Sequence, residues 1–263
     1  MSDRKPVFLV LGAGAGIGGQ VAARFALGGY HAVLARRSDE AGLKRLVGQI
    51  EDAGGEASGI LVDASVDGTI EDLVERVENE IGPIECALYN LGAQIGNRSL
   101  ANTPHRTFEL GWRLGCFGLF RLSHALLPRM VERGRGTMLV TSATAAVRGN
   151  EGQHSHAAAM GGRRMLCQTL NAEFARQGIH IAHILIDGAV DAPDTLGKML
   201  GNSFEDFKAA KGDDGVVDPA ALAETYWHLA HQPRSCWSHE IDLRPWTDTP
   251  WWNDNPQSAI NRN

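Results

Sequence analysis

A glycine-rich run, Gly12 to Gly18, is the segment of this chain whose residue types and spacing point most directly to chemistry. It follows the apolar stretch Pro6 to Leu11 and opens the amphipathic stretch Ile17 to Leu27. A loop with few Cβ atoms between a buried strand and a helix lets backbone N–H groups and the positive helix end approach a pyrophosphate closely. The run therefore predicts a dinucleotide-binding loop, with contacts from Gly12, Gly16, Ile17 and Gly18.

Two arginines, Arg36 and Arg37, follow the next strand-like stretch, Ala32 to Ala35. An acidic residue at this point of such a fold would bind the ribose 2′-hydroxyl of NAD, whereas guanidinium groups pair with the 2′-phosphate of NADP. The pair therefore favours NADP(H) over NAD(H). The alternative is two solvated arginines after a strand, and their place relative to the glycine run argues against it.

Three further residues lie where strand-like stretches end. Asp63 follows Gly59 to Val62, and its carboxylate could accept a hydrogen bond from the adenine amino group of a nucleotide. Asn90 and Gly92 lie at the end of the stretch Glu85 to Leu91, beside the same expected cleft. Each is a weak signal alone.

Apolar stretches alternate with helical patterns along the chain, which indicates a parallel sheet covered on both faces by helices. Further strands are expected at Thr137 to Thr141, His180 to Ile186 and Glu240 to Leu243. Helices are expected at Glu40 to Ala53, Thr69 to Ile81, Thr107 to Val131, His156 to Arg176 and Asp218 to His231. The sequence therefore predicts a single α/β domain over residues 1–263, a doubly wound parallel sheet of the Rossmann type.

Two segments fall outside this alternation. Residues 188–216 combine glycines, Pro193 and a weak apolar pattern, which predicts a long connection that is either a substrate lid or a plain surface excursion. The tail, residues 244–263, carries Trp246, Trp251 and Trp252, which we expect to pack on the same subunit or across a subunit interface.

Composition excludes several classes of partner. The chain has 263 residues, 43% hydrophobic and 21% charged, and its net charge of −6 argues against nucleic-acid and anionic-membrane partners. No apolar run is long enough to cross a membrane, and the four cysteines lack C-x-x-C spacing. We expect a cytoplasmic protein with reduced core cysteines, no metal site and a small-molecule substrate.

Together these residues resemble the short-chain dehydrogenase/reductase family over nearly the whole chain. The family's glycine signature, G-x-x-x-G-x-G, fits Gly12, Gly16 and Gly18, its acidic adenine contact fits Asp63, and its N-N-A-G stretch appears as Tyr89 to Gly92. The resemblance implies a bound nicotinamide cofactor and reversible hydride transfer between a carbonyl and an alcohol. It also implies a homodimer or homotetramer formed through the two long helices.

Other residues occupy all four of the family's catalytic positions. Anchoring the helix on Leu170 to Glu173 puts His156 at the position of the catalytic tyrosine and Met160 at that of the lysine four residues later. The same resemblance gives Ala143 for the serine that polarises the carbonyl and Gly115 for the asparagine that supports a water relay. The standard proton-handling groups are therefore missing.

His156 is the ionisable side chain expected at the proton-transfer point. An imidazole titrates near neutrality without help, unlike a phenol with a pKa of about 10, so losing the tyrosine and its lysine together is chemically coherent. The sequence predicts an atypical NADP(H)-dependent oxidoreductase acting on an unknown carbonyl or alcohol. The ending Ser238 to Trp246 resembles that of an atypical bacterial branch whose tyrosine is also replaced, although that branch usually keeps the lysine.

Other interpretations stay open. The protein could be a cofactor-binding pseudoenzyme, a sensor or scaffold without hydride transfer, or a non-redox isomerase or dehydratase with His156 as base and Asp187 nearby. His154 and His156 could also be plain polar residues at a helix start, where Ser155 could cap free N–H groups. A metal-binding pair of His154 and His156 is disfavoured, because no third ligand lies at a helpful local spacing.

Overall fold

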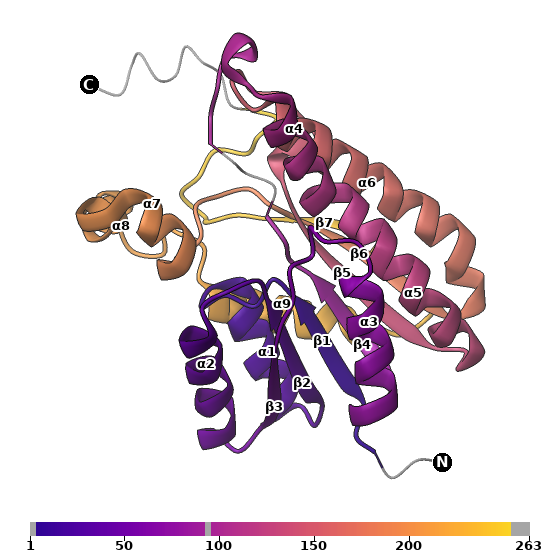
Figure 1. Cartoon of the computed structure of the whole chain (residues 1–263). Coiled ribbons are helices and arrows are strands. Elements are labelled where there is room, and N and C mark those ends of the chain that lie inside the picture. The colour runs from indigo at the N-terminus through magenta and orange to yellow at the C-terminus, as the bar shows by residue number, and fades with distance from the viewer. Residues whose placement is uncertain (1–3, 93–95, 254–263) are drawn as a thin grey trace.

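Seven parallel strands form one sheet in the described part of this computed structural model, residues 4–92 and 96–253 (Figure 1). Their spatial order is β3-β2-β1-β4-β5-β6-β7, and each neighbouring pair is parallel. The bounds are β1 Val7–Leu11, β2 His31–Arg36, β3 Glu56–Leu61, β4 Ile84–Tyr89, β5 Gly136–Ala143, β6 Ile179–Ile186 and β7 Glu240–Leu243. The predicted doubly wound α/β fold is confirmed.

Helices cover both faces of this sheet. One face carries α1 (Ile17–Leu27), α2 (Glu40–Asp52) and α9 (Pro219–Ala230). The other carries α3 (Thr69–Arg76), α4 (His105–Trp112), α5 (Gly118–Glu132) and α6 (His154–Phe174). Asp218 begins α9 as expected, since its carboxylate accepts hydrogen bonds from the N–H groups of Ala220 and Ala221.

Alternation along β1 explains why its sequence is apolar throughout. Val7, Leu9 and Leu11 pack into the core on the α5 side, and Phe8 and Val10 pack on the α1 side. A central parallel strand is buried on both faces, so both sets of alternate residues must be apolar.

The cysteines follow the prediction of core positions only in part. Cys86 and Cys167 are buried, whereas Cys116 is only partly buried and Cys236 is exposed. All four are free thiols.

The strand order reverses at β1, because the chain passes outward to β2 and β3 and then returns to β4 on the other side. The loops after β1 and β4 therefore leave the sheet in different directions and open a crevice at its carboxyl edge. The glycine loop, residues 12–18, lies at this point between β1 and α1.

Two stretches predicted as continuous helices contain π-helical turns. Val77–Ile81 continues α3, and Arg113–Phe117 separates α4 from α5. Two consecutive carbonyl oxygens of the second turn accept side-chain hydrogen bonds, Leu114 from the Tyr89 hydroxyl and Gly115 from Nε of Arg163, each at 2.5 Å. These hydrogen-bond partners are distant in sequence, so helical periodicity alone does not predict the π turn.

Residues 188–216 are more structured than the weak apolar pattern indicated. They contain a π-helical turn, Pro193–Gly197, and two short helices, α7 (Lys198–Leu200) and α8 (Phe204–Lys211). These helices form the orange projection at the left of Figure 1. A parallel bridge between Val190 and Val217 closes the base of the segment, which we call the lid segment.

The described part of the tail packs on its own subunit. Asp187 accepts hydrogen bonds from Nε of Arg244 and from the backbone N–H of Trp251. Lys211 of α8 pairs with Asp248 at 2.7 Å, which ties the tail to the lid segment. Trp246 stays 79% exposed, and residues 254–263 of the predicted tail lie outside the described residues.

Gly118→Ala is expected to destabilise the fold by about 1–3 kcal/mol, because the added methyl group would overlap the hydroxyl of buried Tyr89. The hydroxyl cannot move without weakening its bond to Leu114. Urea denaturation measures the change, with Gly48→Ala in α2 as control because its added Cβ meets nothing within 4 Å. Equal denaturation midpoints for Gly118→Ala and the wild type would contradict this packing.

Candidate active site and cofactor cleft

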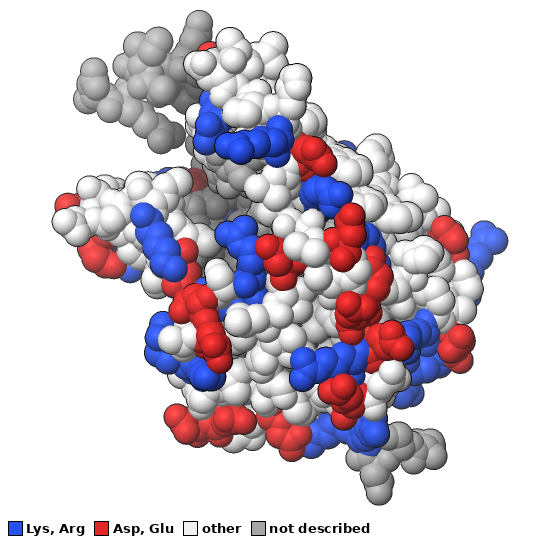
Figure 2. Space-filling view, viewed as in Figure 1, with Lys and Arg blue, Asp and Glu red and all other residues white. Residues whose placement is uncertain are grey.

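A cleft of about 500 Å³ opens at the carboxyl edge of the sheet, along the glycine loop and the ends of β1, β2, β4 and β5. Its wall contains the residues expected from the sequence to bind the cofactor, together with the expected proton-transfer residue. These are Gly12, Gly16, Ile17, Gly18, Arg36, Arg37, Asp63, Asn90, Gly92 and His156. Figure 2 shows a hollow with basic side chains between the lid segment and the body of the protein.

The glycine loop is held close to the end of β4. Nδ2 of Asn90 donates to the carbonyl oxygen of Gly12 at 2.9 Å, and its backbone N–H donates to Leu11 at 2.8 Å. Gly12 has φ of +98°, and a Cβ there would lie 2.7 Å from the Asn90 carbonyl oxygen. Both conformation and space therefore require glycine at this position.

The next glycines of the loop pack against backbone and small side chains. A Cβ on Gly16 would lie 2.7 Å from Cβ of Ala192 in the lid segment, and one on Gly18 would lie 2.5 Å from the carbonyl oxygen of Gly12. Side chains are thus excluded at Gly16 and Gly18. The shape of the loop fits a close approach of a nucleotide phosphate to the start of α1.

Arg36 carries a nitrogen that lacks a partner. Its Nη1 is buried and makes no hydrogen bond within the described residues, while Nη2 lies 3.3 Å from Asp39 and 3.8 Å from Asp194. Arg37 lines the same end of the cleft and is exposed. Buried polar groups normally have partners, so the orphaned Nη1 fits an absent acceptor such as a phosphate oxygen.

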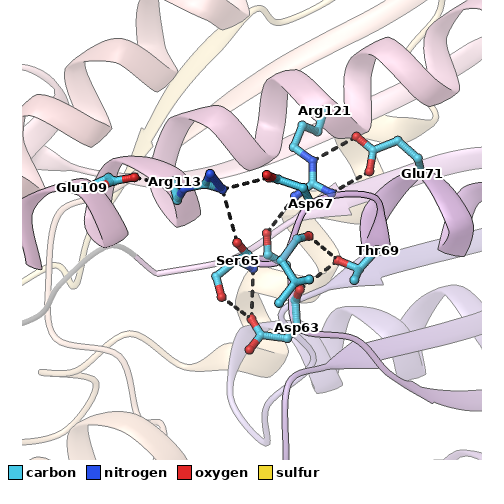
Figure 3. Close-up of polar contacts among 10 residues, drawn as sticks. Asp63, Ser65, Asp67, Thr69, Glu71, Glu109, Arg113 and Arg121 are labelled. Carbon is cyan, nitrogen blue, oxygen red and sulfur yellow. Dashed lines mark hydrogen bonds and ion pairs between the residues drawn. The ribbon is translucent and has the colours of Figure 1, made fainter. Parts of the chain in front are cut away.

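Asp63 is fixed by its own loop. Its Oδ1 accepts from the hydroxyl of Ser65 at 2.6 Å and from the Ser65 backbone N–H at 3.0 Å. The hydroxyl bond, more than the backbone bond, holds the pKa of Asp63 below its ordinary value. Figure 3 shows that Arg113 in turn contacts the Ser65 carbonyl and Asp67. Asp63 is therefore an ionised acceptor held at the edge of the cleft.

A carboxylate of the lid segment lies against the glycine loop. Oδ2 of Asp194 accepts a hydrogen bond from the backbone N–H of Ala15 at 3.2 Å. Burial alone would raise the pKa of Asp194, but this bond together with Lys198 and Arg36 keeps it below the ordinary value. The negative charge of Asp194 thus lies beside the loop that would receive a phosphate.

The start of α6 supplies the other end of the cleft. His156 is half-buried and its Nδ1 has no partner among the described residues. Ser155 does not cap the helix as expected, since its hydroxyl donates to the carbonyl of Phe108 in α4 and ties the two helices together. Met160 is buried one helical turn further along, on the cleft wall.

Ser142, not Ala143, faces Met160. The Thr141 hydroxyl contacts the hydroxyl of Tyr226 in α9, on the opposite face of the sheet, while Oγ of Ser142 points to Sδ of Met160 at 3.8 Å. Strand alternation then turns Ala143 toward the α9 side. The family resemblance assigned the serine position to Ala143, but the structure offers a buried hydroxyl one residue earlier in the same cleft.

Arg163 is a cleft residue that the sequence did not single out for the site, whereas Ser142 is the hydroxyl that a one-residue slip from Ala143 offered. Arg163 is 2% exposed and lines the cleft from α6, seven residues after His156. That spacing places both residues on one helix face, which was an available signal. By contrast, no local pattern marked Asp194, because its place depends on the path of the lid segment.

Asp187, considered as a partner for His156 in non-redox chemistry, is engaged elsewhere. It is not among the cleft-lining residues, and it binds Arg244 and Trp251 of the tail. Within the described residues, no group of three or more histidine, cysteine, aspartate or glutamate side chains could hold a metal ion. No described helix is both long and apolar enough to cross a membrane.

The chain belongs to the short-chain dehydrogenase family, whose model matches residues 6–195. The short-chain reductase protein NovJ of Streptomyces niveus is 30% identical over 234 residues, which cover 87% of this chain and 88% of that protein. The 7alpha-hydroxysteroid dehydrogenase of Escherichia coli K12 is 26% identical over 199 residues, 73% of this chain and 77% of that protein.

Solved structures agree with this assignment. A short-chain dehydrogenase from Rhodopseudomonas palustris has a TM-score of 0.77 at 30% identity, covering 92% of this chain and 100% of that chain. A single-residue variant of actinorhodin polyketide ketoreductase, solved with NADPH, has a TM-score of 0.80 at 25% identity and covers 92% and 96%. The protein is therefore a member of an oxidoreductase family with the Rossmann nucleotide-binding fold.

Asp194→Asn is expected to strengthen binding of a nicotinamide dinucleotide by roughly two- to fivefold, because an anion at a helix N-terminus is worth about 0.3–1 kcal/mol and competes there with phosphate. Isothermal titration calorimetry measures the affinity. Asp206→Asn in α8 is the control, since Asp206 is exposed and the same charge change occurs away from the glycine loop. Unchanged or weaker binding by Asp194→Asn would show that Asp194 does not compete with the ligand.

Proposed function

We propose that the protein is an atypical NADP(H)-dependent oxidoreductase that interconverts a carbonyl and an alcohol, with His156 as the proton-transfer group. The observation that carries this proposal is that the imidazole of His156 and the hydroxyl of Ser142 line one cleft with the complete glycine loop. The substrate is a small molecule bound at the His156 end, next to the lid segment.

Preference for NADP(H) rests on Arg36. Its buried Nη1 lacks an acceptor among the described residues, and it ends β2, where cofactors of this fold present the adenosine ribose. A 2′-phosphate supplies oxygen acceptors and negative charge, whereas a 2′-hydroxyl supplies neither charge nor a bidentate partner. Arg37 adds a second cation at the same end. The ketoreductase solved with NADPH supports the same choice.

A bound nicotinamide would accept or donate the hydride; the chain itself has to handle the proton and orient the substrate. Burial, and after it the positive charge of Arg163, lowers the pKa of His156 below its ordinary value. His156 is therefore a neutral imidazole at pH 7 and accepts the hydroxyl proton of an alcohol. In the reverse direction it donates that proton only when it is protonated, which requires a lower pH.

Ser142 is placed to hold the reacting oxygen. Within the described residues its hydroxyl has only the Met160 sulfur as hydrogen-bond acceptor, and a thioether is a weak acceptor. A substrate carbonyl or alcohol oxygen is a better partner, so we expect Ser142 to donate to it. Met160 provides no charge to hold the nicotinamide ribose, in contrast to the lysine of the family.

The absence of a positive charge at Met160 favours a second candidate, a pseudoenzyme that binds NADP(H) as a sensor or scaffold. Positioning contributes strongly to hydride transfer, and the neutral thioether gives no ribose anchor. The two candidates differ in turnover, not in binding. A non-redox isomerase or dehydratase has less support, because Asp187 is bound by the tail.

Arg36→Ala is expected to weaken NADP(H) binding on the order of tenfold to a hundredfold, because a hydrogen bond to a charged group is worth about 1.5–3 kcal/mol. NAD(H) binding should change much less. A thermal-shift series with NADPH, NADP, NADH and NAD checks this, since a ligand of the native state raises its melting temperature. Arg45→Ala on the exposed face of α2 serves as control. Equal losses of affinity for NADP(H) and NAD(H) in Arg36→Ala would contradict a contact between Arg36 and the 2′-phosphate.

Alcohol oxidation is expected to slow as the pH falls through the lowered pKa of His156, below about 6.5, while carbonyl reduction speeds up over the same interval. His156→Gln should lose roughly a hundred- to ten-thousandfold in turnover, the usual contribution of general acid–base catalysis. Absorbance of reduced nicotinamide across a panel of alcohols and ketones measures both.

His154→Gln is the matched control, because His154 lies two residues earlier and does not line the cleft. Turnover by His156→Gln equal to the wild type would exclude His156 from the reaction. Nucleotide binding without turnover on any substrate of the panel would instead favour the pseudoenzyme.

A further inference from the structure

Arg163 is a fully buried cation whose hydrogen bonds all go to main-chain carbonyls. Nε donates to Gly115 at 2.5 Å, Nη1 to Thr141 at 2.5 Å and Nη2 to Leu91 at 2.7 Å. The three acceptors come from three different parts of the fold: the π turn before α5, strand β5 and the end of β4. One guanidinium therefore joins three segments that form the floor of the cleft.

No carboxylate balances this charge among the described residues. The nearest aromatic contact is the ring of Tyr89, whose centroid lies 5.0 Å from Cζ of Arg163. The adjacent Arg164 differs sharply, because its guanidinium forms a bidentate pair with Glu240 at 2.7 and 2.8 Å. Buried cations without a counter-ion are costly, so a retained one indicates a role that neutral residues would not fill.

Arg163 shares one face of α6 with His156 and Met160. Residues 156, 160 and 163 are separated by four and three positions, which places them on successive turns of one helix stripe. All three line the cleft. Met160 offers no cation at its own position, and Arg163 brings one from the next turn.

Other ionisable groups near His156 do not oppose this charge. The small hollow on the other side of His156 is lined by exposed Arg98 from the loop before α4, by His154 of α6 and by neutral residues. Cys116 of the π turn is a neutral thiol, since burial raises its pKa. The polar residues that β5 contributes to the cleft wall, Thr141 and Ser142, carry no ionisable group.

The two acidic residues of the cleft wall lie at its nucleotide end. Asp63 is bound by Ser65, and Asp194 is bound by the glycine loop. Neither faces His156 through any contact in the described residues. Among the described charged groups, Arg163 is therefore the one that lowers the pKa of His156, after the larger effect of burial.

We propose that Arg163 is a positioning residue for the proton transfer proposed above: its guanidinium fixes the floor of the cleft, and its unbalanced charge adds to burial in keeping His156 a neutral, proton-accepting imidazole. This inference rests on the proposed role of His156, but its electrostatic part does not require turnover. An imidazolium beside a buried guanidinium would place two positive charges together in a medium of low polarity.

Two substitutions separate the charge from the hydrogen bonds. Arg163→Lys keeps the charge but loses the planar fork, whereas Arg163→Gln keeps a hydrogen-bond donor and loses the charge. The pKa of His156 is read in the cofactor-free protein from the pH dependence of its imidazole NMR signal, assigned with His156→Gln. We expect this pKa to move upward in Arg163→Gln and to stay low in Arg163→Lys.

Arg164→Gln is the matched control, because it removes a neighbouring cation that Glu240 already neutralises. It should leave the His156 signal unchanged. Where turnover is measurable, the pH limb of alcohol oxidation should move upward in Arg163→Gln by the same shift as the NMR titration. A His156 pKa unaltered in Arg163→Gln, or raised equally in Arg163→Lys, would overturn the proposal.

Should Arg163→Gln fail to fold, the wild-type protein still decides the question. The Nε–H signal of Arg163, identified by its loss in Arg163→Lys, should shift at the pH where His156 titrates and should not shift in His156→Gln. An Nε–H signal that does not shift as His156 titrates would overturn the proposal. If the enzyme turns over but the Arg163 signal does not follow the His156 titration, the proposed function stands and the role of Arg163 is rejected. If the signal follows the titration but there is no turnover, only the proposed function is rejected.

Discussion

The buried guanidinium of Arg163 binds three main-chain carbonyls. The His156 end of the cleft depends on this arrangement. Leu91 follows β4, Gly115 lies in the π turn before α5 and Thr141 lies within β5, and their oxygens converge on one buried side chain. Buried carbonyl oxygens without hydrogen bonds cost free energy, so these three require a donor with several N–H groups in one plane. Arginine meets this need, and it brings a charge with it.

The consequences of that charge extend along the cleft. Cations lie at both ends, with Arg36 and Arg37 toward the nucleotide and Arg163 toward His156. Asp194 of the lid segment lies against the glycine loop at the nucleotide end, where it balances part of the charge of Arg36. A nucleotide carries its own negative charge to the same place. A bound phosphate would therefore compete with Asp194 for the backbone N–H of Ala15.

Much of this arrangement follows from local sequence. The bounds of α1 and β7 agree with the prediction, because adjacent residues signal both a glycine loop and a short strand of alternating charged and apolar residues. The expected site residues meet in one cleft because adjacent parallel strands end at the same edge. The π turn at Arg113–Phe117, the contact of Asp194 and the orientation of Ser142 depend on partners far along the chain. Periodicity cannot encode those partners.

In the proposed reaction, His156 and Met160 in place of the family's tyrosine and lysine are electrostatically consistent. Lowering the pKa of a phenol from about 10 to about 7 requires about 4 kcal/mol of differential stabilisation, which a neighbouring ammonium group can supply. An imidazole needs no such help, and a lysine at residue 160 would only hold it further from protonation. With the charge at Arg163 instead, the cation is one turn deeper and bound to backbone. Arg163 can lower the pKa of His156 without contacting the reacting atoms, but no cation at residue 160 binds the nicotinamide ribose. Cofactor affinity must then come from the other end of the cleft, where Arg36 retains a buried nitrogen with no partner in the described structure.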